Sequence, residues 1–230
     1  MSDNLRATIG YTAQWLKANG IKIPSAVRGD MIKYRIHAIK SQEDYQNELS
    51  ALVAALIAGT ITKAAFEKAY SQLIADYMGE AWAVGGADGL STASLDALIQ
   101  DEQSHVKDFA TAIITAGALT DGITARIALW ANRYQDAVNR AAIIAGVDNG
   151  DNMVWVYGDT IDHCSTCAAC KDIVASADEW SAAGDLGFRP QAPDLECGGW
   201  NCLCSIVPTD EKRNVPDGMT LPDYILSRGA

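Results

Sequence analysis

The cysteines of this chain are confined to one short stretch of its sequence. All six lie between residues 164 and 204, as Cys-x2-Cys-x2-Cys, a 26-residue gap and Cys-x4-Cys-x-Cys, and the 163 residues before them contain none. Two cysteine turns that a loop brings together can supply the four ligands of a tetrahedral zinc ion. We therefore expect a separate C-terminal unit that is built around a metal ion.

Three explanations compete for these cysteines, and zinc is the one that we favour. The N-terminus lacks the positive-then-apolar pattern of a secretory signal, which indicates a reducing compartment where thiols stay free. Structural disulfides would need an oxidising destination, such as the exterior of an extracellular particle. A redox-active Cys-x2-Cys normally opens a helix after a strand in a βαβ unit, and only the preceding strand is expected here.

We expect one structural zinc ion per chain, held by both cysteines of the first turn and two of the three in the second cluster. The candidate ligands are therefore Cys164, Cys167, Cys197, Cys202 and Cys204. His163 and Cys170 are the reserve candidates, and Cys170 could instead be a small buried hydrophobic residue.

A catalytic zinc is disfavoured, because it would keep an open position with mixed ligands, and the His-x-Glu partner of the zinc deaminases is missing. A structural zinc fits better, because the apolar residues of the segment are too few to fold unaided. These residues are Trp155, Tyr157, Trp180, Trp200 and Ile206.

The part of the chain before the cysteines has the pattern of a helical domain. Apolar residues recur with steps of three and four, which is typical of helices with one buried face. We predict helices over residues 43–58, 66–84, 95–116 and 123–146, and weaker ones over 5–19 and 26–40. Thr60 or Thr62 is expected to cap the helix over 66–84, Asp121 the helix over 123–146, and Gly146 to end the latter.

After residue 147 the composition changes to that of a mixed unit. A polar loop precedes an aromatic and β-branched run at 153–158, which predicts a strand. A short helix is expected over 177–183, and a second strand from Ser205. The predicted fold is mainly α: a helical domain over 1–147, a small α+β cysteine-rich zinc-knuckle module over 148–208, and a polar tail over 209–230 that is extended or forms a short helix near Tyr224.

Charge is distributed unevenly along the chain. The net charge is −11, but residues 1–40 carry seven basic residues against two acidic ones. An acidic body disfavours broad nucleic-acid coating, whereas the basic first 40 residues could meet an acidic partner or a phosphate, or form a solvated helical face. No run approaches the length of a membrane span, so we expect no membrane association.

No pattern in the helical half indicates an enzyme. Glu102-x-x-His105, with Asp101 and Asp108, has the spacing that di-iron sites use, but such sites need a second Glu-x-x-His on a partner helix and none is present. We therefore expect a solvated helical face there. The chain also lacks a Gly-x-Ser-x-Gly nucleophile turn.

A family resemblance rests on the C-terminal motifs. These are Trp-Val-Tyr-Gly-Asp at 155–159, Asp-His-Cys-Ser-Thr-Cys at 162–167, Glu-Trp at 179–180, prolines at 190 and 193, and Leu-Glu-Cys-Gly-Gly-Trp-Asn-Cys-Leu-Cys at 195–204. Together they resemble the C-terminal half of phage minor head proteins, the head-morphogenesis family related to phage Mu protein F. The similarity covers residues 120–208. Many members have His-Pro before the final Cys-x-Cys, whereas this chain has Cys197-Gly198-Gly199.

The resemblance implies a structural role in a tailed bacteriophage. Such proteins act in few copies with the portal or inside the capsid, assist head assembly, and can enter the host with the genome. The expected partners are portal or capsid proteins and further copies of the chain, and the expected locations are the virion and, during assembly, the host cytoplasm. The alternatives are a nucleic-acid-binding zinc ribbon, for which residues 150–208 offer only Lys171 and Arg189 as basic residues, and a thiol–disulfide oxidoreductase.

Overall fold

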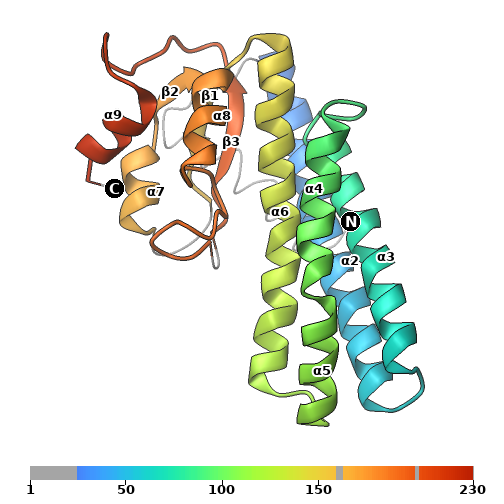
Figure 1. Cartoon of the computed structure of the whole chain (residues 1–230). Coiled ribbons are helices and arrows are strands. Elements are labelled where there is room, and N and C mark those ends of the chain that lie inside the picture. The colour runs from blue at the N-terminus through green and yellow to red at the C-terminus, as the bar shows by residue number, and fades with distance from the viewer. Residues whose placement is uncertain (1–24, 159–162, 200–201, 230) are drawn as a thin grey trace.

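The chain forms an elongated helical bundle with a small mixed module packed on one side of it (Figure 1). This computed structural model describes residues 25–158, 163–199 and 202–229, with side chains from residue 40 onward. The protein is mainly helical, and it carries a small three-stranded sheet and a cluster of buried cysteines. The helix expected over 5–19 lies outside the described residues.

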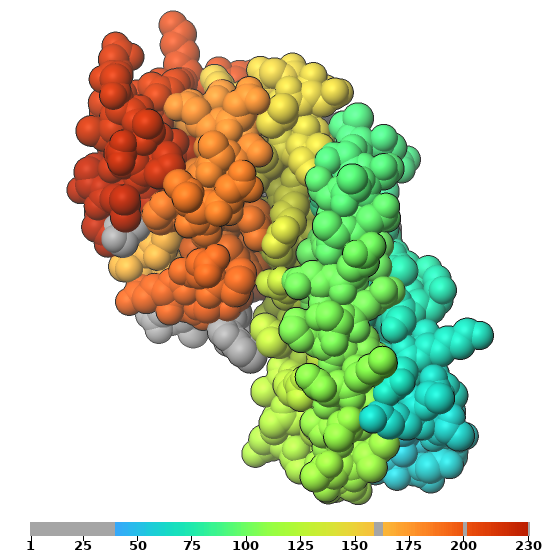
Figure 2. Space-filling view, viewed as in Figure 1, coloured from blue at the N-terminus to red at the C-terminus, as the bar shows by residue number. Residues whose placement is uncertain are grey.

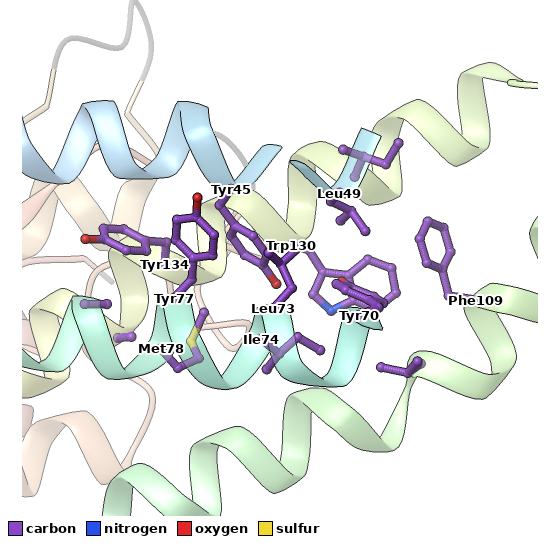
Figure 3. Close-up of a cluster of buried hydrophobic side chains, with 14 of the residues drawn as sticks. Tyr45, Leu49, Tyr70, Leu73, Ile74, Tyr77, Met78, Phe109, Trp130 and Tyr134 are labelled. Carbon is purple, nitrogen blue, oxygen red and sulfur yellow. The ribbon is translucent and has the colours of Figure 1, made fainter. Parts of the chain in front are cut away.

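Within the described residues, five helices build the bundle. They are α2 (Ser25–Ile57), α3 (Lys63–Val84), α4 (Thr92–Ser104), α5 (Val106–Ala116) and α6 (Asp121–Asn149). Their shared core is rich in aromatic residues, as Figure 3 shows: Tyr45, Tyr70, Tyr77, Phe109, Trp130 and Tyr134 all lie within it. Among the described residues, no helix is both long and apolar enough to cross a bilayer.

Two of the predicted helix boundaries are corrected by local geometry. The helix expected over 95–116 is divided into α4 and α5 at His105, whose N–H bonds to the carbonyl of Glu102 in a tighter turn. Neither glycine nor proline marks this break, so the sequence carries no signal for it. In the opposite sense, the helices expected over 26–40 and 43–58 are the single helix α2.

Helix α6 begins and ends at other residues than expected. Thr120, not Asp121, is its N-cap, and it accepts a hydrogen bond from the N–H of Ile123. The helix continues past Gly146 to Asn149, and Gly150 ends it in the left-handed conformation. Gly146 has a packing role instead, because a Cβ there would lie 2.8 Å from the sulfur of Met153 and 3.0 Å from the Cβ of Ala177. The cap at Thr62 of α3 is confirmed.

The module is built on a three-stranded antiparallel sheet with the order β2-β1-β3. Its strands are β1 (Asn152–Val156), β2 (Val174–Ser176) and β3 (Ser205–Thr209), and Trp155 pairs with Ile206. Three short helices complete it: α7 (Ser165–Cys170), α8 (Ala177–Asp185) and α9 (Leu221–Ser227). A capping box between Ser176 and Glu179 fixes the start of α8.

The residues after 208, expected as a separate tail, belong to the core of the module. Val215, Leu221 and Ile225 are buried there with Trp155 and Trp180. Outside this core, Arg213 binds the carboxylate of Glu179 at 2.8 Å and ties the segment to the start of α8. The short helix foreseen near Tyr224 is α9.

Helix α6 is buried on two sides and joins the bundle to the module. One face packs into the bundle, while Asp136, Asn139 and Ile143 face the module. Asp136 has no exposed surface, and its carboxylate accepts hydrogen bonds from Arg189 of the module at 2.8 Å and from Arg140 at 3.1 Å. A buried carboxylate thus fixes how the two parts meet.

We predict that Asp136→Ala lowers the free energy of unfolding by about 3 kcal/mol, because it leaves two guanidinium groups without their shared partner. Chemical denaturation followed by circular dichroism measures this loss. The matched control is Asp96→Ala on the exposed face of α4, which should change stability by less than about 0.5 kcal/mol. Equal effects of the two substitutions would contradict the role given to Asp136.

Candidate metal centre

The first cysteine turn is shaped by helix α7. Cys164 is the N-cap of this helix, and its sulfur accepts a hydrogen bond from the N–H of Cys167 at 3.4 Å. One turn of helix then directs Cys167 into the module, where only 2% of it is exposed. This is the compact turn that the Cys-x2-Cys spacing predicts.

The second cluster reaches the same point from the other side of the gap. Cys202 and Cys204 lie in the segment that leads into β3, and both are buried. Alternate residues of an extended segment point to the same side, so both sulfurs can face α7. The sulfurs of Cys167 and Cys202 are 3.9 Å apart, and those of Cys167, Cys202 and Cys204 all lie within 4.8 Å of one another.

This geometry fits a tetrahedral metal ion. Zinc–sulfur bonds of about 2.3 Å at tetrahedral angles place neighbouring sulfurs about 3.8 Å apart. The separation of Cys167 and Cys202 is close to this value without any rearrangement. Thiolates are soft ligands, which bind zinc well, whereas calcium and magnesium bind oxygen ligands instead. Three buried cysteines therefore favour zinc over calcium or magnesium. The three cysteines could therefore bind a metal.

Three groups border the cluster and are candidates for the fourth position. The Nδ1 atom of His163 is 3.8 Å from the sulfur of Cys204, and the ring of Tyr157 stacks on the imidazole with centroids 3.6 Å apart. Cys164 and Cys197 are the other two, and both are half-buried. An imidazole would complete a shell of three thiolates and one nitrogen, whereas a fourth thiolate would complete an all-sulfur shell.

The five predicted ligands are therefore not equivalent in the structure. Cys167, Cys202 and Cys204 form the buried cluster, whereas Cys164 and Cys197 are half-buried and lie at its margin. The reserve candidate Cys170 is fully buried in the apolar core of the module and does not belong to the cluster.

The thiols of the cluster share their protons unequally. Hydrogen bonds from the thiols of Cys167 and then Cys204 lower the pKa of Cys202 to about 3, while the bond to Cys202 raises the pKa of Cys167. Burial raises the pKa of Cys164, but hydrogen bonds from Cys167 outweigh it, and the pKa is lowered. The cluster thus stabilises one thiolate, that of Cys202, whereas the pKa values of Cys167 and Cys204 are raised, so a bound metal ion would displace their protons.

Polar contacts from outside the cysteine turns hold the centre in place. The carboxylate of Glu196 accepts hydrogen bonds from the N–H and the hydroxyl of Ser165, each at 2.7 Å, and so joins the two cysteine segments. The side-chain amide of Gln191 donates to the carbonyls of Cys202 and Cys204. Each contact fixes the backbone that carries the sulfurs.

Asn139 links helix α6 to this centre. The Nδ2 atom of Asn139 donates a hydrogen bond to the side-chain oxygen of Gln191, and its Oδ1 atom accepts one from the N–H of Ile206 at 3.1 Å. Sequence reasoning missed both Asn139 and Gln191. The available signal was a second polar row, with Asp136 and Asn139 three residues apart, on a helix that has an apolar stripe.

The prediction of a solvated helical face at residues 101–108 is wrong for Glu102. Only 4% of this residue is exposed, and its carboxylate accepts a hydrogen bond from Arg133 of α6 at 2.6 Å. His105 is exposed at the end of α4, and Asp101 and Asp108 are exposed as expected. The carboxylate therefore serves the packing of α4 on α6.

We predict that Gln191→Ala lowers the free energy of unfolding by about 2 kcal/mol, because it removes the donor to the buried carbonyl of Cys202 and leaves the amide of Asn139 and the carbonyl of Cys204 only their long mutual contact of 3.4 Å. Chemical denaturation followed by tryptophan fluorescence, to which both the bundle and the module contribute, measures the loss. Gln72→Ala on the exposed face of α3 is the control and should cost less than about 0.5 kcal/mol. A Gln191 variant as stable as the parent would rule out this supporting role.

Comparisons of the chain with protein-family models, with curated proteins and with solved structures found no match.

Proposed function

We propose that the cysteine cluster binds one structural zinc ion and that this ion holds the C-terminal module in a fixed shape. The observation that carries the proposal is the convergence of Cys167, Cys202 and Cys204 in the interior of the module, from segments 35 residues apart. The fourth ligand would come from the residues at the edge of the cluster, His163, Cys164 or Cys197. Four protein ligands with no open position are typical of structural zinc sites. The role is structural rather than catalytic.

We further propose that the protein is a minor head protein of a tailed bacteriophage. The support is the resemblance of residues 120–208 to that family, together with the order of a helical half followed by a cysteine module. In this role the bundle and the module would form one docking unit for portal or capsid proteins, or for further copies of the chain. The protein would be located in the virion and, before that, in the cytoplasm of the host during assembly.

The charges of the module count against a nucleic-acid-binding zinc ribbon. Arg189 is buried against Asp136, and Lys171 lies over the ring of Tyr157 at 5.1 Å and within 3.8 Å of Asp172. These are the two Lys or Arg residues between 150 and 208, and each pairs with a carboxylate of the protein, so they do not form an extended basic surface. Phosphate contacts normally require a cluster of free basic side chains.

One observation favours thiol–disulfide exchange as a second candidate function. Cys164 is half-buried at the start of a helix and Cys167 is fully buried behind it, the arrangement of attacking and resolving thiols in Cys-x2-Cys oxidoreductases. Reduction of insulin disulfides by the purified protein tests this function. If zinc abolishes this reductase activity and chelation restores it, thiol–disulfide exchange would be favoured over structural zinc binding as the function of the cysteines.

We predict that the purified protein contains about one zinc ion per chain, and that Cys167→Ser, Cys202→Ser and Cys204→Ser each remove it. Metal analysis by mass spectrometry gives the stoichiometry. Cys170→Ala is the matched control, since Cys170 is buried in the same module but outside the cluster and its substitution should leave the zinc in place.

Single substitutions of His163, Cys164 and Cys197 identify the fourth ligand, because the variant that lacks this ligand releases zinc and the other two retain it. If imidazole closes the shell, only His163→Ala releases zinc, whereas a fourth thiolate makes Cys164→Ala or Cys197→Ala the variant that does. A protein that binds no zinc when refolded with excess metal, and is equally stable with and without it, would falsify the zinc proposal.

We also predict that chelation unfolds the module before the bundle. Among the described residues, the large aromatic side chains fully buried in the module core are Trp155 and Trp180, whereas the bundle has its own extensive aromatic core. Near-ultraviolet circular dichroism should therefore lose the signal of the module while most of the helical signal in the far ultraviolet remains. Simultaneous loss of both signals would show instead that the two parts fold as one unit.

The head assignment is tested on particles. Mass spectrometry of purified virions from the phage that encodes this chain should detect it in few copies relative to the major capsid protein. A particle that assembles to full infectivity without the chain, and never contains it, would contradict the assignment while leaving the zinc site intact.

A further inference from the structure

A polar groove lies between the bundle and the module, on the face shown in Figure 2, where α6 forms its floor between α8 and α4. Its volume is about 290 Å³. The polar lining comes from three different parts of the chain. Ser91 and Ser94 lie at the start of α4, Arg140 on α6, and Ser181 and Arg189 on the module. No role described above uses this groove.

The two arginines of the groove have hydrogen-bond donors to spare. Arg189 uses Nε for Asp136 and Nη1 for the carbonyl of Gly184, and Arg140 uses Nε for Asp136. Among the described residues, no acceptor is bonded to Nη2 of Arg189 or to either terminal nitrogen of Arg140. Because these nitrogens are not among the fully buried polar atoms without a partner, they keep exposed surface, and both side chains line the groove.

Charged groups of both signs border the groove. Asp136 binds Arg140 and Arg189 from below, while its third neighbour Arg133 binds Glu102 and lines the separate cavity beside Trp130. The groove itself is therefore bordered by two cations, Arg140 and Arg189, and two anions, Asp136 and Asp185. Burial lowers the pKa of Arg140, and the neighbouring Arg189 and Arg133 lower it further, against the attraction of Asp136.

The serines add neutral donors on the opposite wall. The hydroxyls of Ser91 and Ser94 are 2.8 Å apart, and the hydroxyl of Ser91 does not cap α4, although Ser91 occupies the capping position. One proton of this pair can therefore be directed to a ligand. The exposed carboxylate of Asp185 also lines the groove and opposes an anion.

We propose that this groove binds an oxyanion of the size of phosphate, either as the free ion or as the terminal group of a phosphate monoester. Two planar guanidinium groups with free N–H donors match the tetrahedral oxygens of phosphate, which has acceptors in enough directions for the serines as well. A cation is disfavoured by the arginines. An apolar ligand would leave the free donors without partners.

Calorimetry and thermal unfolding of the full-length protein test the proposal, with inorganic phosphate, phenyl phosphate and chloride at matched ionic strength. Phosphate or its monoester should bind in the millimolar range or tighter and raise the unfolding temperature, whereas chloride should not. Tighter binding of phenyl phosphate than of phosphate would identify a monoester as the ligand, and the reverse order would identify the free ion.

Variants locate the binding in the groove. Arg140→Gln should lower the affinity for phosphate about tenfold or more, because it removes charge-assisted hydrogen bonds. Asp185→Asn should raise that affinity, because it removes a negative charge from the groove. Arg126→Gln, in the separate cavity beside Trp130, is the control and should leave binding unchanged. Arg189 is left intact, because it also holds the module to α6.

Three results would overturn the proposal. They are stabilisation by chloride equal to that by phosphate, phosphate binding that Arg140→Gln leaves undiminished, and no detectable binding of either phosphate compound to the folded parent protein. If Arg140→Gln fails to fold, Asp185→Asn provides the test. An affinity for phosphate that Asp185→Asn leaves unchanged would show that phosphate binds outside the groove.

Discussion

The burial of helix α6 on two sides is the constraint on which the rest of the structure depends. A helix in a bundle normally shows one apolar stripe and one solvated face, but here the second face carries Asp136 and Asn139, which the module covers. Covering polar groups is favourable only when each finds a partner. The module supplies those partners with Arg189, Gln191 and the backbone of β3. The position of the cysteine cluster relative to the bundle follows from these few contacts.

The sequence predicted what depends on local patterns. The apolar stripes placed the helices of the bundle, and Thr62 and the spacing of Cys164 and Cys167 identified a cap and a tight turn. What it could not predict depends on contacts between distant residues. Gly146 seemed to end a helix because glycine often does, whereas its small size is needed where Met153 and Ala177 approach. The break at His105 has no marker residue at all.

The same distinction applies to the metal centre. Composition and spacing identified the cysteines, but six thiols and one imidazole offer more than four ligands, and only the fold separates Cys167, Cys202 and Cys204 from the others. Cys170 illustrates the limit, since it follows Cys167 by the same spacing that links Cys164 to Cys167. The helix carries it into the apolar core instead. Gln191 and Asn139 were invisible for a related reason: a supporting residue has no spacing rule that ties it to the sulfurs it positions.

The ionic contacts at the junction favour orientation over stability. A buried ion pair often contributes no more than well-packed apolar residues of the same size, because desolvation offsets the attraction. Apolar packing between α6 and the module would therefore hold the two parts as firmly, but it would tolerate sliding. The carboxylate of Asp136 accepts hydrogen bonds from Arg140 of its own helix and from Arg189 of the module, which requires a defined orientation of the two parts. One turn further along α6, Asn139 accepts a hydrogen bond from the N–H of Ile206 and so fixes β3. Such a junction holds the two parts in one relative orientation. It also accounts for the arginines that surround Asp136, since a carboxylate without them could not be buried there.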